Sequence, residues 1–332
     1  MRRREGRYWP ARRAWNLTKS LKFPAVAPQH GNFRNPQLFV VKVQGPGSSA
    51  ANSWVRMSLR LPQSYAQPGN GEVSIPAPAG APRLKDIYDS YFKIVLAETE
   101  EQRHLAFRLR YEVYCVEHPY EDPHKNSNGM ETDIYDPVAL HALLINRQSN
   151  SLVGAARLIL PQVDGKIITL PIRDVCTHEL VAHDNPALPR AHTGEISRFA
   201  ISKNFRRRAN DETSVGSFTI NSSDPRRVIP NTSLGLMQAI VMMAAKARVT
   251  HLCAVMEPTL LRMVRMLGIN WIPLGPPVEY HGRRQPCYSD LDVLLTGIWL
   301  ERTDVWELVT DDGRLWPLNR QLAASLRDVQ PA

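Results

Sequence analysis

Residues 193–202 read TGEISRFAIS, and this stretch decides how the rest of the chain is interpreted. Its β-branched and aromatic residues predict a strand that begins near a glycine and ends in polar residues. Two charged residues, Glu195 and Arg198, stand inside a segment that otherwise favours burial. Because an unpaired charge is costly to bury, they either lie on a solvated face of the strand or pair within a functional site. The charged motifs elsewhere in the chain favour the site.

The basic character of the chain is concentrated near its N-terminus. The 332 residues carry a formal net charge of +9, and residues 1–92 hold 14 of the 41 Lys and Arg but only 4 of the 32 Asp and Glu. The rest of the chain holds 27 basic and 28 acidic residues, so its charge gives no indication of nucleic-acid binding. Hydrophobic residues make up 43% of the chain, which allows a sizeable core.

Residues 1–90 are rich in proline and glycine and are predicted to be a disordered basic extension. Such a segment leaves peripheral contact with an anionic membrane surface open, whereas no nucleic-acid partner is expected. No apolar run is long enough for a transmembrane helix, and no hydrophobic region follows the initial arginines as it would in a signal peptide. We therefore expect a cytoplasmic location.

The cysteines are Cys115, Cys176, Cys253 and Cys287, and no two of them are close in sequence. Zinc ligation needs clustered ligands, so no metal site is expected. Buried free thiols in a reducing compartment are the expected state.

Residues 91–320 predict an α/β (α+β) domain, a mixed central sheet flanked by helices, with a tail at 321–332. Strands are expected at 93–97, 139–145, 152–160, 193–202, 251–256, 271–274 and 278–280. Helices are expected at 100–116, 172–181 and 258–267, and another follows residues 231–235 and runs to about 248. Residues 291–300 fit either a last strand or a last helix. In the first helix, Leu105, Leu109, Val113 and Val116 form the expected buried stripe.

Charged residues recur beside these elements. Arg110 lies on the first helix, and Arg157 lies inside the strand at 152–160. The loop at 118–137 ends in three carboxylates within six residues, Glu131, Asp133 and Asp136. A loop of this length in a compact domain is usually functional or disordered, so an acidic surface loop is the alternative interpretation.

A second group of residues fits phosphate binding. The segment after the Glu195/Arg198 strand contains Arg206, Arg207 and Arg208, and the helix that follows begins near Ser233 and Gly235. A helix N-terminus presents unpaired N–H groups and a positive dipole end, which suit the phosphates of a donor cofactor. These five residues are the candidate cofactor-binding set, and a solvated loop is the alternative for the arginines.

Taken together, the motifs resemble a known family. Arg110 with Val113-Tyr114, the run from Glu131 to Asp136, Gly154-x-x-Arg157 and Glu195-x-x-Arg198 look like the signature of the acyl-homoserine-lactone autoinducer synthases, within the GNAT-like acyltransferases. More closely, the chain resembles the acyltransferase associated with the PEP-CTERM/exosortase protein-sorting system. The resemblance covers roughly residues 92–320.

The resemblance implies a GNAT-like fold and transfer of an acyl group from a thioester to an amine. It implies that Glu195 is the base, and that Asp133 and Asp136 hold the acceptor, with the arginines Arg110, Arg157 and Arg198 paired to these carboxylates; that network could instead be mainly structural. No tightly bound cofactor is expected. The donor is an acyl-acyl-carrier-protein or acyl-coenzyme A thioester, and the partners are an acyl carrier protein and a small amine.

Two departures from the pattern shape the alternatives. The loop after the first helix has Tyr120 where the autoinducer synthases usually carry a tryptophan, and spaced glycines of a pyrophosphate loop are not evident, which favours a carrier-protein donor. One alternative is an S-adenosylmethionine-using autoinducer synthase. The other is a non-catalytic module that binds acyl carriers. The sequence does not indicate an oligomeric state.

Overall fold

The computed structural model describes residues 39–41, 55–57, 82–206 and 232–327. Its contacts divide the chain into two units, residues 1–70 and 71–332. In the first unit, β1 (Phe39–Val41) pairs with β2 (Val55–Met57) in an antiparallel ladder.

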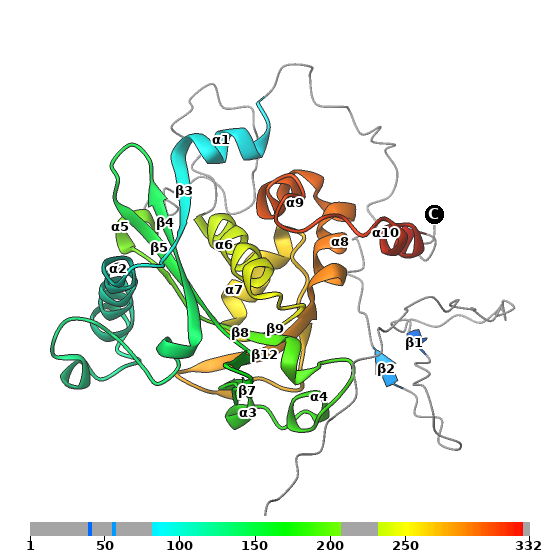
Figure 1. Ribbon diagram of the computed structural model, residues 1–332, viewed down its shortest axis with the longest axis horizontal. Coiled ribbons are helices and arrows are strands. Elements are labelled where there is room, and N and C mark those ends of the chain that lie inside the picture. Colours follow the sequence, from blue (N-terminus) through cyan, green and yellow to red (C-terminus); the bar gives the residue numbers. More distant parts are fainter. Residues whose placement is uncertain (1–38, 42–54, 58–81, 207–231, 328–332) are drawn as a thin grey trace, which may run out of the picture. The chain divides into compact units, whose positions relative to one another are not determined.

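The second unit is built on a mixed eight-stranded sheet in the order β10-β12-β9-β8-β5-β4-β3, with β11 paired to β12 (Figure 1). The strands are β3 (Phe92–Leu96), β4 (Ala139–Asn146), β5 (Leu152–Ile159), β8 (Thr193–Ile201), β9 (His251–Met256), β10 (Ile272–Pro273), β11 (Val278–Glu279) and β12 (Arg283–Asp290). Among the described strands, only the β8–β9 pair is parallel, and β6 (Gln162–Val163) and β7 (Lys166–Ile167) form a separate ladder. The expected mixed α/β architecture is confirmed.

Helices cover both faces of this sheet. They are α1 (Leu84–Tyr91), α2 (Glu100–Tyr111), α3 (Ile172–Val175), α4 (Glu179–Ala182), α5 (Lys203–Arg206), α6 (Thr232–Ala247), α7 (Pro258–Met266), α8 (Leu291–Glu301), α9 (Thr303–Thr310) and α10 (Arg320–Arg327). Short helices of other types are η1 (Glu112–Glu117, a π-helix) and the 3-10 turns η2 (Pro123–Asn126), η3 (Asp136–Val138) and η4 (Arg190–His192).

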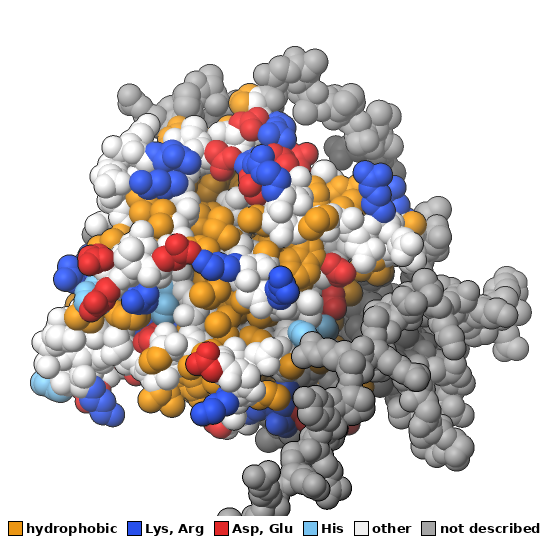
Figure 2. Space-filling view, viewed as in Figure 1, with side chains coloured by type: hydrophobic (Ala, Val, Ile, Leu, Met, Phe, Trp, Pro, Cys, Tyr) orange, Lys and Arg blue, Asp and Glu red, His pale blue; other side chains and the backbone are white. Residues whose placement is uncertain are grey.

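The main hydrophobic core lies between the sheet and α6. Leu236, Ile240, Met243 and Ala244 are all buried there, as the sequence predicts. The opposite face carries two smaller clusters, one beneath α2 and one beneath α3 and α4. Figure 1 shows α2 and α6 on opposite sides of β4 and β5. On the face in Figure 2, basic and acidic side chains are interspersed over the described surface.

Several elements differ from their expected form. The helix expected at 172–181 is two short helices, α3 and α4, and 291–300 lies in a helix, α8. The sequence prediction missed β12, whose sequence RRQPCYSD has no clear alternation and a proline in the middle, as well as α9 and α10. The structure also places α1 ahead of the expected domain start at residue 91, in contact with α9.

The predicted buried stripe of the first helix is confirmed at Leu109 and Val113 and wrong at its two ends. Leu105 is 42% exposed and Val116 is 62% exposed. The buried positions of α2 and η1 are instead Ala106, Leu109, Arg110, Val113 and Cys115. The stripe is rotated because Arg110, a residue that pattern analysis assigns to the surface, is buried by ion pairs. Thr99 begins α2 as the expected N-cap, in a capping box with Gln102.

The first turn of α6 is packed against α1 at Gly235. A Cβ atom at Gly235 would overlap the Tyr88 hydroxyl and would lie 2.7 Å from Cδ1 of Leu144. Tyr88 is 1% exposed, so it has no room to move aside. The missing side chain of Gly235 therefore allows α1 and the sheet to approach α6 closely.

We expect Gly235→Ala to lower the free energy of unfolding by about 1–3 kcal/mol because of overpacking. Gly297→Ala in α8 is the matched control, since a Cβ there meets open space and an alanine favours the helix. Urea denaturation of both variants measures the difference. Equal stability of the two variants would contradict the close packing at Gly235.

Candidate active site

Strand β8 carries a bulge that turns Arg198 toward the face covered by α2. The register of β5 against β8 shifts between Ala155 and Arg157, and β8 holds one extra residue there. Arg198 has φ 50°, a left-handed conformation that residues other than glycine seldom adopt. Ile196 packs into the core beneath α6, and regular alternation would send Arg198 to the same face. The bulge instead places its guanidinium among the carboxylates of the acidic loop.

Arg110 of α2 binds two of these carboxylates. Its Nε donates to Glu131 at 2.5 Å, and Nη1 and Nη2 donate to the two oxygens of Asp136 at 2.6 and 3.1 Å. All three side chains are nearly inaccessible to solvent. Arg110 lies at the helix position that faces the sheet, and its fork matches the carboxylate of Asp136.

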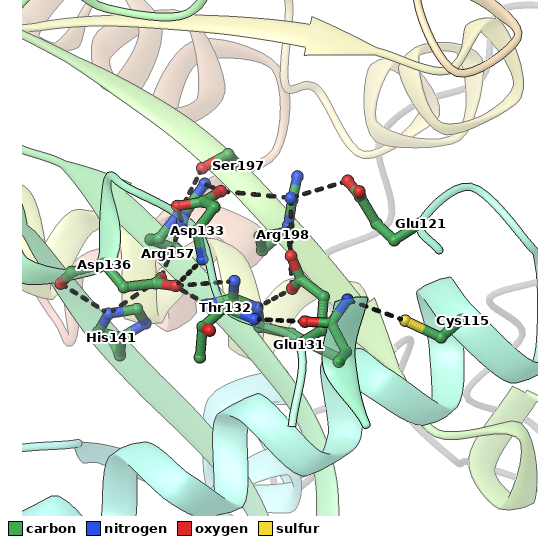
Figure 3. Close-up of polar contacts among 12 residues, drawn as sticks. Cys115, Glu121, Glu131, Thr132, Asp133, Asp136, His141, Arg157, Ser197 and Arg198 are labelled. Carbon is green, nitrogen blue, oxygen red and sulfur yellow. Dashed lines mark hydrogen bonds and ion pairs between the residues drawn. The ribbon is translucent and has the colours of Figure 1, made fainter. Parts of the chain in front are cut away.

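Arg157 of β5 joins the same network from the sheet. Its Nη1 and Nη2 donate to Asp133 at 2.5 and 2.9 Å, and Nη1 also reaches Asp136 at 2.7 Å. Its Nε donates to the hydroxyl of Ser197 at 2.9 Å, across the β5–β8 pair. Arg157 thus fixes the acidic loop to the sheet (Figure 3).

Arg198 completes the network at its solvent side. Its Nε lies 3.1 Å from both oxygens of Glu131, and Nη2 donates to Glu131 at 2.8 Å and to Glu121 at 2.9 Å. Asp133 lies 3.2 Å from the same Nη2. The guanidinium carbon stands 5.6 Å from the centre of the Tyr114 ring.

The arginines keep the buried carboxylates of the network ionised. Burial opposes ionisation of Asp136, but Arg110 and Arg157 outweigh it and hold the pKa of Asp136 well below its usual range. The pKa of Glu131 is lowered against burial by Arg110 and Arg198 in the same way. Burial also lowers the pKa of the adjacent His141 to about 4, so its imidazole is neutral at pH 7. Groups whose pKa values lie this far from neutrality do not exchange protons near pH 7.

The π-helix η1 and a distant hairpin enclose the site. The carbonyl of Tyr114 accepts the N–H groups of Tyr120 and Glu121 at 2.9 and 3.0 Å. From the turn between β11 and β12, Nδ1 of His281 lies 3.0 Å from the carbonyl oxygen of Tyr120, and Arg284 stacks over the Tyr120 ring at 5.1 Å. π-Helical turns occur frequently at functional sites.

Glu195 lies apart from this network. One carboxylate oxygen accepts the backbone N–H of Ile172 at 2.8 Å, and the side chain is 3% exposed. Burial raises the pKa of Glu195 to about 8, with the N–H of Ile172 and the charge of Arg157 offsetting burial only in part. The parallel pairing of β8 with β9 runs from Thr193 to Ile196, so it ends one residue beyond Glu195. Glu195 is therefore a buried carboxyl that can exchange a proton near neutral pH.

The structure thus brings six of the predicted residues into one network: Arg110, Glu131, Asp133, Asp136, Arg157 and Arg198. The sequence did not identify their partners Glu121, Ser197 and His141. The signal for Ser197 was its place between Glu195 and Arg198, but Glu121 and the hairpin at His281 have no motif that links them to the site.

The candidate cofactor-binding residues are less closely grouped. Arg206 ends α5, and Arg207 and Arg208 lie outside the described residues. Ser233 and Gly235 are buried in the first turn of α6. The contacts of Gly235 give it a packing role beside Tyr88, and the structure does not assign it to a phosphate.

No cluster of three metal-ligating side chains occurs in the part of the chain that the structure describes. The four cysteines are free and buried there, as expected. No helix within the described ranges has the length and hydrophobicity needed to cross a membrane.

A protein-family comparison matches the part of the chain that holds these residues. Residues 109–215 match the family described as acetyltransferase (GNAT) domain, a span that contains every residue of the network and Glu195. No curated protein matches the chain.

Among solved structures, TofI in a ternary complex with an inhibitor and MTA is 21% identical, with a TM-score of 0.44 over 63% of this chain and 96% of that one. BjaI, a CoA-dependent acyl-homoserine lactone synthase with SAM and isopentyl-CoA, is 19% identical, with a TM-score of 0.39 over 68% and 89%. FeeM, an N-acyl amino acid synthase from uncultured soil microbes, is 15% identical, with a TM-score of 0.42 over 64% and 96%.

Proposed function

We propose that this chain, an N-acyltransferase with a GNAT-like fold, moves an acyl group from a carrier thioester to an amine with Glu195 as the base. The observation that carries the proposal is the buried carboxyl of Glu195, whose pKa is raised to about 8 by burial. A base is most effective when its pKa is close to the working pH. Glu195 also lies where β8 ceases to pair with β9, and unpaired strand backbone there can accommodate a substrate.

The reaction forms a C–N bond and breaks a C–S bond. The neutral amine attacks the thioester carbonyl, Glu195 accepts a proton from the nitrogen directly or through a water, and the carrier leaves as a thiolate. The proton removed from nitrogen ends on the sulfur, so the products are an amide and a free carrier thiol. The protein supplies a positioned base and a preorganised polar site for the charge that develops on the carbonyl oxygen.

Two carboxylates of the network are exposed enough to bind the acceptor amine. Asp133 is 24% exposed and Glu121 is 28% exposed, whereas Glu131 and Asp136 are fully engaged in the interior. A partly exposed carboxylate pair favours an acceptor that arrives as a cation, as most amines do at neutral pH. Asp133 would then hold the acceptor, and Asp136 would orient the loop.

For the donor we propose an acyl carrier protein thioester, with acyl-coenzyme A as the second choice. We also propose a role in PEP-CTERM/exosortase protein sorting, which only the family resemblance implies. An autoinducer synthase that uses S-adenosylmethionine is the first alternative, and detection of a lactone in the culture medium would identify it. A non-catalytic acyl-carrier-binding module is the second alternative.

Intact-mass spectrometry tests the proposal. The purified full-length protein is mixed with a panel of acyl-carrier-protein and coenzyme A thioesters, and a cell extract supplies the acceptors. Loss of the acyl group from one class of carrier, together with a new acylated amine, would support the proposal and identify both substrates. If folded protein binds a carrier but releases no acyl group from any donor, the acyltransferase proposal is replaced by the non-catalytic binding module.

A further inference from the structure

The three arginines of the site differ in how fully their nitrogens are used. All three guanidinium nitrogens of Arg110 and all three of Arg157 donate hydrogen bonds to carboxylates or to Ser197. Arg198 donates from Nε and Nη2. Its Nη1 has no hydrogen-bond partner among the described residues. Within the part of the chain that the structure describes, the network therefore presents one unused guanidinium nitrogen.

This nitrogen, Nη1, belongs to the most exposed of the three arginines. The side chain of Arg198 is 16% exposed, against 1% for Arg110 and 2% for Arg157. Glu131, Glu121 and Asp133 hold the rest of the guanidinium in place, so its orientation is set before any ligand binds (Figure 3). The left-handed backbone of Arg198 is a strained conformation of the kind that structures maintain at functional sites.

The charges around Arg198 decide which ligand suits its free nitrogen. Three guanidinium groups face four carboxylates, Glu121, Glu131, Asp133 and Asp136, so the site already has a net negative charge. A further full anion would be repelled by these carboxylates. A neutral carbonyl oxygen meets no such repulsion, and it gains negative charge only during the reaction. Such an oxygen is a better ligand for Arg198 than a carboxylate or a phosphate.

The position of Arg198 on β8 fits that ligand. Arg198 is three residues beyond Glu195 and two beyond Ile196, the last residue of β8 that pairs with β9. We propose that Nη1 of Arg198 donates a hydrogen bond to the carbonyl oxygen of the acyl thioester and stabilises the negative charge on that oxygen in the tetrahedral intermediate. This inference rests on the proposed function. It makes Arg198 a catalytic residue, beyond its pairing with the acidic loop.

In the step concerned, the amine nitrogen bonds to the carbonyl carbon and the C=O electron pair moves onto oxygen. Arg198 keeps its protons throughout and only donates the hydrogen bond. The intermediate collapses when that electron pair re-forms the carbonyl and the C–S bond breaks. The proton taken from nitrogen by Glu195 passes to the thiolate, so atoms and charge balance without a further reactant.

Donor analogues test the inference without an acceptor. We would measure, by calorimetry, the binding of S-(2-oxooctyl) and S-octyl derivatives of both coenzyme A and acyl carrier protein. Only the first derivative has a carbonyl, and neither can transfer its chain. The full-length wild-type protein is expected to bind the carbonyl analogue about tenfold more tightly, the usual effect of a hydrogen bond to a charged donor.

Arg198→Gln is expected to bind the two analogues equally, and Arg103→Gln, an arginine in the first turn of α2 that donates to the carbonyl of Glu98, to keep the tenfold preference. Where Arg198→Gln does not fold, Arg198→Lys replaces it, because one ammonium group cannot serve Glu131 and the carbonyl in the geometry of the fork.

A folded Arg198 variant that keeps the preference overturns the inference. A wild-type protein that binds both analogues equally overturns it too, while the proposed acyl transfer stands. Failure of the folded wild-type protein to bind any of the four analogues overturns the proposed function and this inference together.

Discussion

Glu195→Gln is expected to reduce kcat by about 10²–10⁴, the usual contribution of a general base. Glutamine fills the same space and can accept the N–H of Ile172, so the fold around β8 is kept. Glu179→Gln, on the exposed surface of α4, is the matched control and should change neither activity nor stability. Turnover of the Glu195 variant within threefold of wild type would remove Glu195 as the base.

The same substitution is expected to stabilise the protein at neutral and mildly alkaline pH. The folded-state pKa of Glu195, about 8, lies above the value of about 4.3 expected in the unfolded chain. The contribution of the protonated carboxyl to stability is therefore complete below pH about 4.3 and is lost as the pH rises toward 8. Glutamine does not titrate, so the variant should gain about 2–4 kcal/mol relative to wild type at pH 8 and little at pH 4. Urea denaturation at the two pH values measures this difference.

The pH dependence of the wild-type enzyme provides a second measurement. If ionised Glu195 accepts the proton, kcat/KM should rise with pH through a midpoint near 8. Arginine partners hold the pKa values of Glu131, Asp133 and Asp136 below their usual range, so these three carboxylates should contribute no step near neutrality. A rate with no step between pH 6 and 9 would argue for a base other than Glu195.

Arg157→Met is expected to lower the free energy of unfolding by about 3–5 kcal/mol, because it leaves buried carboxylates without their partner. Asp133 would lose two hydrogen bonds, Asp136 one, and the hydroxyl of Ser197 its donor. Methionine keeps much of the volume, so the loss reflects charge more than packing. Chemical denaturation, with circular dichroism as the readout, measures the change.

Arg83→Met is the matched control for that variant. Arg83 also pairs with Asp86 and Asp312, but its side chain is 49% exposed. Exposed ion pairs contribute about 0–1 kcal/mol, so this substitution should have little effect. Adding Asp133→Asn to Arg157→Met should restore part of the stability. A similar, small effect of both arginine substitutions would contradict the burial of the network.

The sequence predicted the elements that follow simple periodicity and the charged residues that have no place in a core. Glu195 and Arg198 are the clearest case, since two charges in an apolar strand required an explanation, and each has a polar partner in the structure. The order of β4, β5, β8, α6 and β9 followed from alternating and helical patterns. The motifs also identified the six residues that the structure brings into one network.

What the sequence could not predict depends on contacts between distant segments. The rotation of α2 results from the burial of Arg110, which is stable only because Glu131 and Asp136 lie opposite it. The strand β12 was missed because Pro286 and the arginines before it do not fit a strand pattern. The bulge at Arg198 and the π-helix η1 involve a single extra residue in each element, and neither has a local signal in this chain.

The contact between Tyr88 and Gly235 also bears on how the catalytic region can be isolated. A fragment that begins at Phe92, the first residue of the sheet, would lack Tyr88 and open a cavity beside the first turn of α6. It would also lack Lys85, which is 5% exposed and is paired with Asp311 at the end of α9. The smallest unit that folds on its own therefore extends back to about Arg83. The short helix α1 covers the hydrophobic interior at one end of α6 and separates it from water.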